Sequence, residues 1–301
     1  MMTEGRLVSR RGVLTMAATG LTATGLAATG LATAPAARAA VSTGPTGVHA
    51  PWAKVADAAT GADIWSRSSS TARPMGSITK VMTAYLVIKA NQLGRVLTVP
   101  EAAVAYDDYY DASTAGLVPG EKLTVRELLI AMLLPSGCDA AYTLAAAYGP
   151  GTARFIAAMN ATARAMGLSH THFADFSGLR AGGEYATYSS AGNLVTLGQA
   201  AMRLPAFRQI VALREYHLPA GGGHRAHTWT NLNPLVGRYP GAIGIKTGYT
   251  SAAGDCLLFE ATRGSRALTG VVLHSSDSIS GLNVAGSDAE RMLDWGFSHY
   301  R

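Results

Sequence analysis

Cysteine is scarce in this chain of 301 residues, which contains only Cys138 and Cys256. Two cysteines do not form the disulfide framework of a small secreted domain. A structural zinc site needs three or four ligands, and the histidine pair His170 and His172 has no third ligand nearby in the sequence. We therefore expect two free thiols, no metal ion and no cofactor.

Charge is also low, at 15% of residues, although the formal net charge is +6. Four of the 25 basic residues, all arginine, lie in the first forty positions, where the single acidic residue is Glu4. From Ala40 onward, 21 basic residues stand against 18 acidic residues, a net charge of +3. No cluster of lysine and arginine interleaved with aromatic residues follows, which excludes nucleic acid as an expected partner.

Long apolar runs are absent except near the N-terminus, where positions 12–37 carry no charge. The run follows a twin-arginine pattern, Ser9-Arg10-Arg11-Gly12-Val13-Leu14, and ends at a small-x-small cleavage site, Ala37-Arg38-Ala39. It is rich in Gly and Thr, which make a poor membrane anchor. We expect a twin-arginine-type signal peptide over 1–39, a linker over 40–51, and an exported, extracytoplasmic protein with no stable membrane anchor after cleavage. A retained membrane helix stays open as the alternative.

The remaining 52–301 reads as one domain with strands at both ends and helices between. Strands are expected at 52–58, 62–66, 244–250, 255–262 and 266–274, and a last helix near 287–297. The predicted fold class is α/β (α+β): a five-stranded antiparallel sheet flanked by helices, with a mostly helical inserted lobe. The sheet lobe comprises about 52–99 and 225–301, and the helical lobe about 100–224.

Two details of the helical lobe follow from local patterns. Asp107, Asp108 and Asp111 alternate with tyrosines, and the segment lacks the glycine and the distal glutamate of a calcium loop. We expect a solvated surface loop there. Thr124 followed by Glu127 forms a capping box, which predicts the start of a helix.

The segment around Ser77 and Lys80 leads into a run that is apolar on every side, Val81-Met82-Thr83-Ala84-Tyr85-Leu86-Val87-Ile88. A helix without a polar stripe belongs inside a domain. Residues three positions apart lie on the same helical face, so the two side chains can meet. Burial disfavours the charged form of a lysine, which suits Lys80 to act as a base.

Three short motifs occur in order along the chain: Ser77-Ile78-Thr79-Lys80, Ser136-Gly137-Cys138 and Lys246-Thr247-Gly248. Each is weak alone. Together they contain two of the five lysines of the chain, and they fall at a helix start, in an interhelical loop and on a strand, the settings that their chemistry needs.

With these motifs the chain resembles the low-molecular-mass penicillin-binding proteins, specifically the serine-type D-alanyl-D-alanine carboxypeptidases, which have the β-lactamase/transpeptidase-like fold. The likeness extends from about Trp52 to Tyr300. It includes Leu134-Pro135-Ser136-Gly137, Asn231-Leu232-Asn233-Pro234-Leu235, Tyr239-Pro240-Gly241-Ala242, Ala253-Gly254-Asp255-Cys256 and Leu293-Asp294-Trp295-Gly296-Phe297.

The resemblance implies a catalytic role for three residues. Ser77 would attack the carbonyl between the two terminal D-alanines of a peptidoglycan stem peptide and form an acyl-enzyme. Lys80 would take the serine proton, and Ser136 would relay a proton toward the leaving amine. β-Lactam antibiotics would acylate the same serine as covalent inhibitors.

The resemblance also implies a substrate-binding role for the third motif. Lys246 and Thr247 would hold the substrate carboxylate, and Gly248 would permit close approach. The backbone N–H groups of Ser77 and Tyr249 would form the oxyanion hole.

Two features depart from the family pattern. The second motif ends in Cys138, where an asparagine is usual, and a thiol is a weak hydrogen-bonding partner for the substrate amide and Lys80. We expect slower hydrolysis, or a tilt toward transfer to an amine acceptor. The arginine that many members carry before the last helix is missing between Leu273 and Glu290, so carboxylate recognition would rest on Lys246 and Thr247.

Two other functions stay open. A class A β-lactamase shares the three motifs but needs a glutamate beyond the second motif to activate the deacylating water, and none occurs between Glu127 and Glu184. A non-catalytic binder of wall peptides or β-lactams could use the same groove. Cys138 favours the binder, whereas Ser77, Lys80 and Lys246 argue against it.

Overall fold

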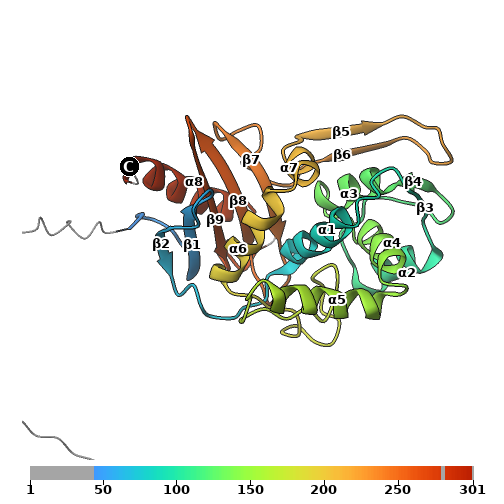
Figure 1. The fold of residues 1–301 in the computed structure, drawn as a ribbon, viewed down its shortest axis with the longest axis horizontal. Coiled ribbons are helices and arrows are strands. Elements are labelled where there is room, and N and C mark those ends of the chain that lie inside the picture. The colour runs from blue at the N-terminus through green and yellow to red at the C-terminus, as the bar shows by residue number, and fades with distance from the viewer. Residues whose placement is uncertain (1–43, 279–281, 300–301) are drawn as a thin grey trace, which may run out of the picture. The chain divides into compact units, whose positions relative to one another are not determined.

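A five-stranded antiparallel sheet organises one side of the described chain, which comprises residues 44–278 and 282–299 of a computed structural model (Figure 1). The spatial order is β2-β1-β9-β8-β7, so the N-terminal hairpin pairs with the three C-terminal strands as expected. Arg263 and Arg266 pair across the turn between β8 and β9, where Gly264 has φ +62°, the conformation that two-residue hairpin turns require. The strands are β1 (Trp52–Asp57), β2 (Asp63–Arg67), β7 (Ala242–Gly248), β8 (Cys256–Arg263) and β9 (Arg266–Leu273).

Helices cover both faces of this sheet. Strand β8 is buried on both sides, and its residues alternate between the two cores, because successive side chains of a strand point to opposite faces. Leu257 and Phe259 pack in the core beside α8 (Leu282–His299), whereas Leu258 packs in the larger core that contains α6 (Ala191–Met202). The helix α6 therefore belongs to the sheet layer, although it lies within the range expected for the helical lobe.

The segment that carries Ser77 leads from the sheet into the helices. A 3-10 turn, Gly76–Thr79, continues directly into α1 (Lys80–Lys89), and seven of the ten α1 residues are buried. The other helices are α2 (Glu101–Tyr110), α3 (Val125–Leu133), α4 (Cys138–Tyr148), α5 (Thr152–Ala165) and α7 (Pro205–Val211). Figure 1 shows α1 between the sheet and the group of α2, α3 and α4.

Two short antiparallel strand pairs accompany these helices. The first pairs β3 (Val96–Thr98) with β4 (Lys122–Thr124), and α2 lies in the connection between them. The second is a hairpin that joins β5 (Glu215–Leu218) to β6 (His227–Thr230) across a glycine-rich tip. The capping box at Thr124 forms as expected: Thr124 Oγ1 accepts a hydrogen bond from the Glu127 backbone N–H, and Glu127 accepts one from the Thr124 backbone N–H.

Three expectations on local structure need correction. The aspartate and tyrosine segment is not a loop, because Glu101–Tyr110 forms α2 and buries Ala103 and Asp107 on one face. The segment 40–51 is not wholly a linker: Val48 is part of the core beside α8, and the backbone N–H of Ala50 donates to Asp288 at 2.9 Å. The last helix is longer than 287–297 and begins at Leu282.

The signal peptide expected over 1–39 lies outside the described residues. Within 44–278 and 282–299, no helix combines the length and the apolar character needed to cross a bilayer.

Candidate active site

A cleft of about 350 Å³ lies where the Ser77 turn, the end of α2, the loop before α4 and the end of β7 meet. Its lining includes residues of all three motifs, namely Ser77, Ser136, Thr247 and Gly248. The segments that meet there are far apart in sequence and are brought together by the fold. Other lining residues include Tyr110, Asp111, Ser113, Leu179, Arg180, Glu184, Leu232, Tyr249, Thr250 and Ser251.

Ser77 and Lys80 form the centre of the site. Lys80 Nζ lies 2.8 Å from Ser77 Oγ, and the Lys80 residue has no exposed surface. Lys80 Nζ has two further partners, Cys138 Sγ at 3.2 Å and the backbone carbonyl of Ser177 at 3.0 Å. Lys80 is thus held by side chains and backbone from three different parts of the chain, with the Ser77 hydroxyl at hydrogen-bond distance.

The second motif is held in an unusual backbone conformation. Ser136 has φ +69°, which non-glycine residues rarely adopt. Ser113 stabilises the turn from both sides: its hydroxyl donates to the Ser136 carbonyl at 2.7 Å, and its carbonyl accepts from the Cys138 backbone N–H at 2.8 Å. These contacts place Ser136 on the wall of the cleft and Cys138 at the start of α4.

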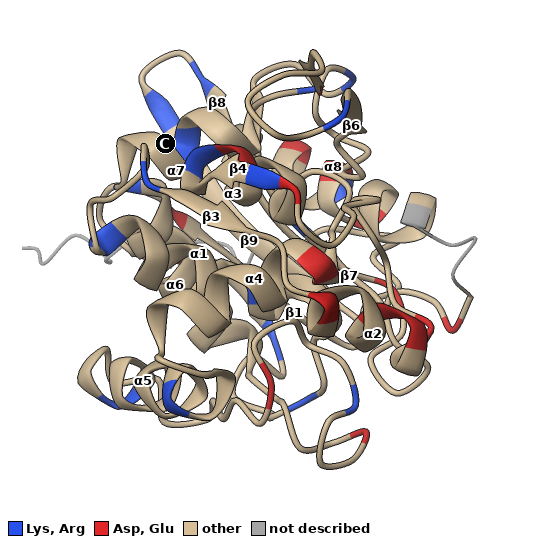
Figure 2. Cartoon of the chain, turned by 90° about the vertical axis from the view of Figure 1, so that its right-hand side faces the viewer, with Lys and Arg blue, Asp and Glu red and all other residues tan. Residues whose placement is uncertain are grey.

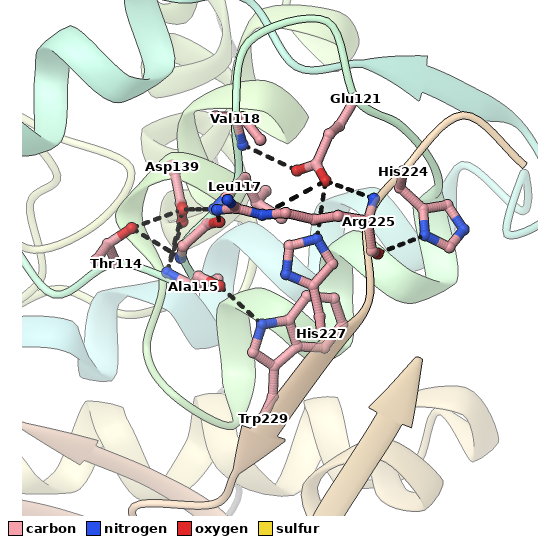
Figure 3. A network of polar contacts seen from close by, with 11 residues as sticks. Thr114, Ala115, Leu117, Val118, Glu121, Asp139, His224, Arg225, His227 and Trp229 are labelled. Carbon is pink, nitrogen blue, oxygen red and sulfur yellow. Dashed lines mark hydrogen bonds and ion pairs between the residues drawn. The ribbon is translucent and has the colours of Figure 1, made fainter. Parts of the chain in front are cut away.

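A polar network fixes the segment that precedes this turn (Figure 3). Asp139, which directly follows Cys138, accepts hydrogen bonds from the Thr114 hydroxyl and from the backbone N–H groups of Ala115 and Leu117, at 2.8 to 3.0 Å. Trp229 on β6 donates its ring N–H to the Ala115 carbonyl at 2.9 Å. The β5/β6 hairpin therefore anchors the loop that carries Ser113.

Glu121 joins the same hairpin to the end of this loop. It accepts from the Val118 backbone N–H at 2.8 Å and the Arg225 backbone N–H at 2.9 Å, and it lies 3.1 Å from the His227 ring nitrogen. Burial acts to raise the pKa of Glu121, but these hydrogen bonds and His227 outweigh it and hold the pKa below its usual value. The loop is therefore tied down at both ends.

Lys246 lies on β7 and is as deeply buried as Lys80, with 1% of its surface exposed. Its Nζ donates to the carbonyl of Thr247 at 3.1 Å and lies 3.3 Å from the Thr247 hydroxyl. Burial, followed by repulsion from Lys80, lowers the pKa of Lys246 well below its ordinary value. The two lysines of the motifs therefore interact electrostatically across the site.

Glycines let backbone segments approach the Ser77 turn closely. A Cβ on Gly76 would lie 2.6 Å from the Tyr249 backbone nitrogen, and one on Gly248 would lie 2.3 Å from the Met75 carbonyl oxygen. A Cβ on Gly178 would lie 2.0 Å from the Gly76 carbonyl oxygen. No side chain fits at these distances, so the end of β7 and the 175–179 loop pack directly on the Ser77 turn.

The structure brings together every site residue that the sequence predicts: Ser77, Lys80, Ser136, Cys138, Lys246, Thr247, Gly248 and Tyr249. Sequence reasoning missed Ser113, Tyr106 and the loop that contains Asp175 and Ser177. The Asp175-Phe176-Ser177-Gly178 segment did carry a signal, because an aspartate two residues before a serine and glycine is typical of a side-chain-stabilised turn.

The cleft also contains charges outside the three motifs. Arg180 and Glu184 line one wall, and Asp111 lies at the end of α2, around which acidic residues gather (Figure 2). The two cysteines are buried free thiols, and burial raises the pKa of Cys256 to about 12. Across the described ranges, no group of three or more potential metal ligands forms.

A serine hydroxyl beside a buried lysine, in a cleft of substrate size, defines a class of serine-dependent acyl-transfer enzymes in which lysine replaces histidine as the base. A sequence model of the family described as D-alanyl-D-alanine carboxypeptidase, peptidase S11, matches residues 39–277. The chain belongs to this family.

Similar proteins extend this assignment. A D-alanyl-D-alanine carboxypeptidase of Streptomyces sp. strain K15 is 39% identical over 252 residues, which cover 79% of this chain and 84% of that protein. The D-alanyl-D-alanine carboxypeptidase DacB2 of Mycobacterium tuberculosis is 35% identical over 244 residues, which cover 81% of each protein.

Solved structures agree with the sequence relatives. The crystal structure of the Streptomyces K15 DD-transpeptidase matches with a TM-score of 0.79 and 37% identity, over 85% of this chain and 99% of that chain. Other structures of that protein carry substitutions of a serine and of a cysteine two positions later. Ser136 and Cys138 have the same spacing.

Proposed function

We propose that this protein is a serine-type D-alanyl-D-alanine carboxypeptidase that acts on peptidoglycan stem peptides through an acyl-enzyme on Ser77. The observation that carries the proposal is the 2.8 Å contact between Ser77 Oγ and the Nζ of buried Lys80 at the cleft, in a chain of this family. A general base must lie within hydrogen-bond reach of the proton that it abstracts.

In the first half-reaction, Ser77 Oγ attacks the carbonyl carbon between the two D-alanines while its proton passes to the Lys80 amine. The C–N bond then breaks, and the leaving D-alanine takes a proton relayed through Ser136, which lies on the cleft wall. The product is an ester of Ser77. Water attacks this ester, Ser77 recovers its proton, and the shortened peptide leaves.

Substrate binding is proposed to involve the end of β7. Thr247 and Lys246 hold the terminal carboxylate, and the backbone N–H groups of Ser77 and Tyr249 bind the oxyanion. The close packing of Gly76 against the Tyr249 nitrogen supports this, because it places the two amides in neighbouring segments of the cleft. β-Lactams would react at the same serine and leave it acylated.

Cys138 favours a contribution from transfer to an amine acceptor. Its sulfur takes the position beside Lys80 where asparagine is usual, and a thiol is a weak hydrogen-bonding partner. Proteins from Streptomyces strain K15 bear the names carboxypeptidase and DD-transpeptidase, which describe hydrolysis and transfer. We infer that this chain catalyses both.

Residues 1–39 are proposed to be a cleaved twin-arginine signal peptide that exports the folded enzyme to its wall substrate. The Arg10-Arg11 pair before a long uncharged run supports this. Fusion of 1–39 to a reporter should direct export, and replacement of both arginines by lysine should stop it. Continued export of the lysine variant through another route would contradict the twin-arginine part.

The central test labels the protein with a fluorescent penicillin and then measures D-alanine release from a stem pentapeptide. Wild type should be labelled and should release D-alanine, and Ser77→Ala should do neither. Absence of label would overturn the acyl-enzyme. Label without D-alanine release would favour a binder or a strict transpeptidase, and rapid penicillin turnover would favour a β-lactamase.

A further inference from the structure

A carboxylate that does not line the cleft, Asp175, organises the loop behind the Ser77 and Lys80 pair. Asp175 is 1% exposed. Its Oδ1 accepts hydrogen bonds from the Ser177 backbone N–H at 2.6 Å, the Ser177 hydroxyl at 2.8 Å and the Leu179 backbone N–H at 3.1 Å, and also from the Gly178 backbone N–H. One oxygen therefore fixes the backbone of three consecutive residues.

The second oxygen of Asp175 is bound by α2. The Tyr106 hydroxyl donates to Asp175 Oδ2 at 2.5 Å and lies 2.8 Å from Ser177 Oγ. Burial, together with the charge of Asp175, raises the pKa of Tyr106 far above its ordinary value, so the phenol keeps its proton and remains a donor. The Tyr106 ring packs against the rings of Tyr142 and Phe176.

The loop held in this way presents two carbonyl groups to α1. The Ser177 carbonyl accepts from Lys80 Nζ at 3.0 Å, and the Phe176 carbonyl accepts from the Thr83 hydroxyl at 2.6 Å. At Gly178 the backbone packs directly on the Gly76 carbonyl. The orientation of the Ser177 carbonyl is therefore set by Asp175 and Tyr106 together.

The Ser177 carbonyl matters for the chemistry because it determines which way the lone pair of the Lys80 amine points. Proton abstraction requires Lys80 Nζ with two N–H donors and one lone pair. The Ser177 carbonyl can only accept, so it takes one N–H, and Cys138 Sγ at 3.2 Å takes the other. The lone pair is then left to face Ser77 Oγ, 2.8 Å away.

We propose that Asp175 and Tyr106 are positioning residues for the reaction: they hold the Ser177 carbonyl so that the lone pair of Lys80 faces the nucleophile. The proposal rests on the proposed acyl-enzyme function and adds a requirement to it. Neither residue contacts the reacting atoms. Their loss should therefore slow the chemical step and leave substrate binding nearly unchanged.

The test measures the acylation rate constant with fluorescent penicillin, the fraction of molecules finally labelled, and kcat and KM for D-alanine release. Asp175→Ala should lower the rate constant and kcat about a hundredfold with KM nearly unchanged. Asp175→Asn keeps an acceptor oxygen for the three amides and should recover most of that loss. Tyr106→Phe removes a single hydroxyl and should lower the rate constant about fivefold.

Tyr142→Phe is the matched control, since its ring shares the packing of Tyr106 and, among the described contacts, its hydroxyl takes no part in the bonds to Asp175 or Ser177. It should keep the wild-type rate constant. If Asp175→Ala labels fewer molecules but at the wild-type rate, Asp175 is structural and the proposal is overturned.

Two further outcomes separate this proposal from the proposed function. Should Asp175→Ala fail to fold, Tyr106→Phe carries the test, and a wild-type rate constant with that variant overturns the proposal. Absence of labelling in the wild type itself would overturn the acyl-enzyme function and the positioning role with it. A labelled wild type together with an unaffected Asp175→Ala overturns the positioning role alone.

Discussion

The two buried lysines of the site are held in contrasting ways. Lys80 is bound by groups 3, 58 and 97 residues away in the chain, on three different segments. Lys246 bonds only to its neighbour Thr247 in the contacts described. One amine is fixed in position by the whole fold, and the other is fixed by its own strand. Catalysis by a base depends on geometry, whereas a charge that attracts a carboxylate acts over a longer distance.

The surroundings of the two lysines differ as well. Asp107, Asp139 and Asp175 are buried in the helical region, and the charge of Lys80 acts on Asp107. The neighbours that shift the pKa of Lys246 are instead Lys80, which lowers it, and Cys138, which raises it. We infer that Lys80 and Lys246 have distinct tasks. Four predictions test this contrast between the two lysines and their surroundings, from the largest expected effect to the smallest.

The largest effect is expected for Lys80→Met, which removes the proposed base and keeps an unbranched side chain of similar length. Acylation by penicillin should slow by about a thousandfold, because positioned acid and base groups contribute factors of this order. Stopped-flow labelling measures the rate constant. Lys89→Met, at the exposed end of the same helix, is the control and should behave as wild type. An acylation rate within tenfold of wild type would remove Lys80 from the mechanism.

Lys246→Met should act mainly on substrate binding. Loss of a hydrogen bond to a charged group costs about 2 kcal/mol, or roughly thirtyfold in kcat/KM, carried by KM. The pH dependence sharpens the contrast. The pKa of Lys246 is lowered, so the charged form that attracts a carboxylate is lost as pH rises through that lowered value, and wild-type KM should increase with pH.

In Lys246→Met, the rise of KM with pH should disappear, as measured by steady-state D-alanine release between pH 5 and 9. A variant whose kcat falls while KM and its pH dependence stay as in wild type would show that the two lysines share one task.

Cys138→Asn should have a moderate effect, because it replaces a weak partner of Lys80 with an amide that both donates and accepts. Hydrolysis should rise about fivefold relative to transfer when a glycine acceptor is present, corresponding to about 1 kcal/mol for one improved hydrogen bond. Chromatography of the two products gives the ratio. The prediction fails if hydrolysis and transfer are both unchanged. Cys256→Ala, in the core of the sheet, should leave the ratio as it is.

Asp107→Asn should have the smallest effect, and on stability. Neither oxygen of Asp107 makes a hydrogen bond of good geometry to a described residue. Thr114 and the Asp139 backbone lower its pKa, but burial, followed by the charge of Asp139, outweighs them and raises the pKa to about 7. The folded protein then binds more protons than the unfolded chain between about pH 4 and 7, so stability falls as pH rises through this range.

The Asp107→Asn variant removes this cost. Solvent screens part of the cost of the Asp107 charge, so we expect the variant to gain about 1 kcal/mol more stability at pH 8 than at pH 5. Urea unfolding at both pH values measures it. Asp108→Asn, at the adjacent exposed position, should show no such difference. An equal gain at both pH values would mean that ionisation of Asp107 is not the cause.

The sheet and the three motifs were predictable from sequence because their signals are local. The strands are short β-rich runs between glycine turns, and Ser77 and Lys80 share a helical face through spacing alone. The helix at Glu101–Tyr110 was missed because its aspartates and tyrosines read as a loop, whereas tertiary packing of Ala103 and of the Tyr106 ring stabilises a helix. The proposed role of Asp175 could not be read from the sequence, because its contact with Tyr106 spans 69 residues.

Three glycines let backbone segments pack on the Ser77 turn. Acylation of Ser77 should therefore depend on complete folding of the domain. Gly76, Gly178 and Gly248 come from the start, the middle and the end of the domain, and all three approaches must form together. A partly folded chain would hold Ser77 without Lys80 correctly placed beside it, and we expect it not to react. The fraction of molecules that a penicillin labels should therefore follow the fraction with complete tertiary structure, and it would report refolding yield and thermal unfolding without a separate probe.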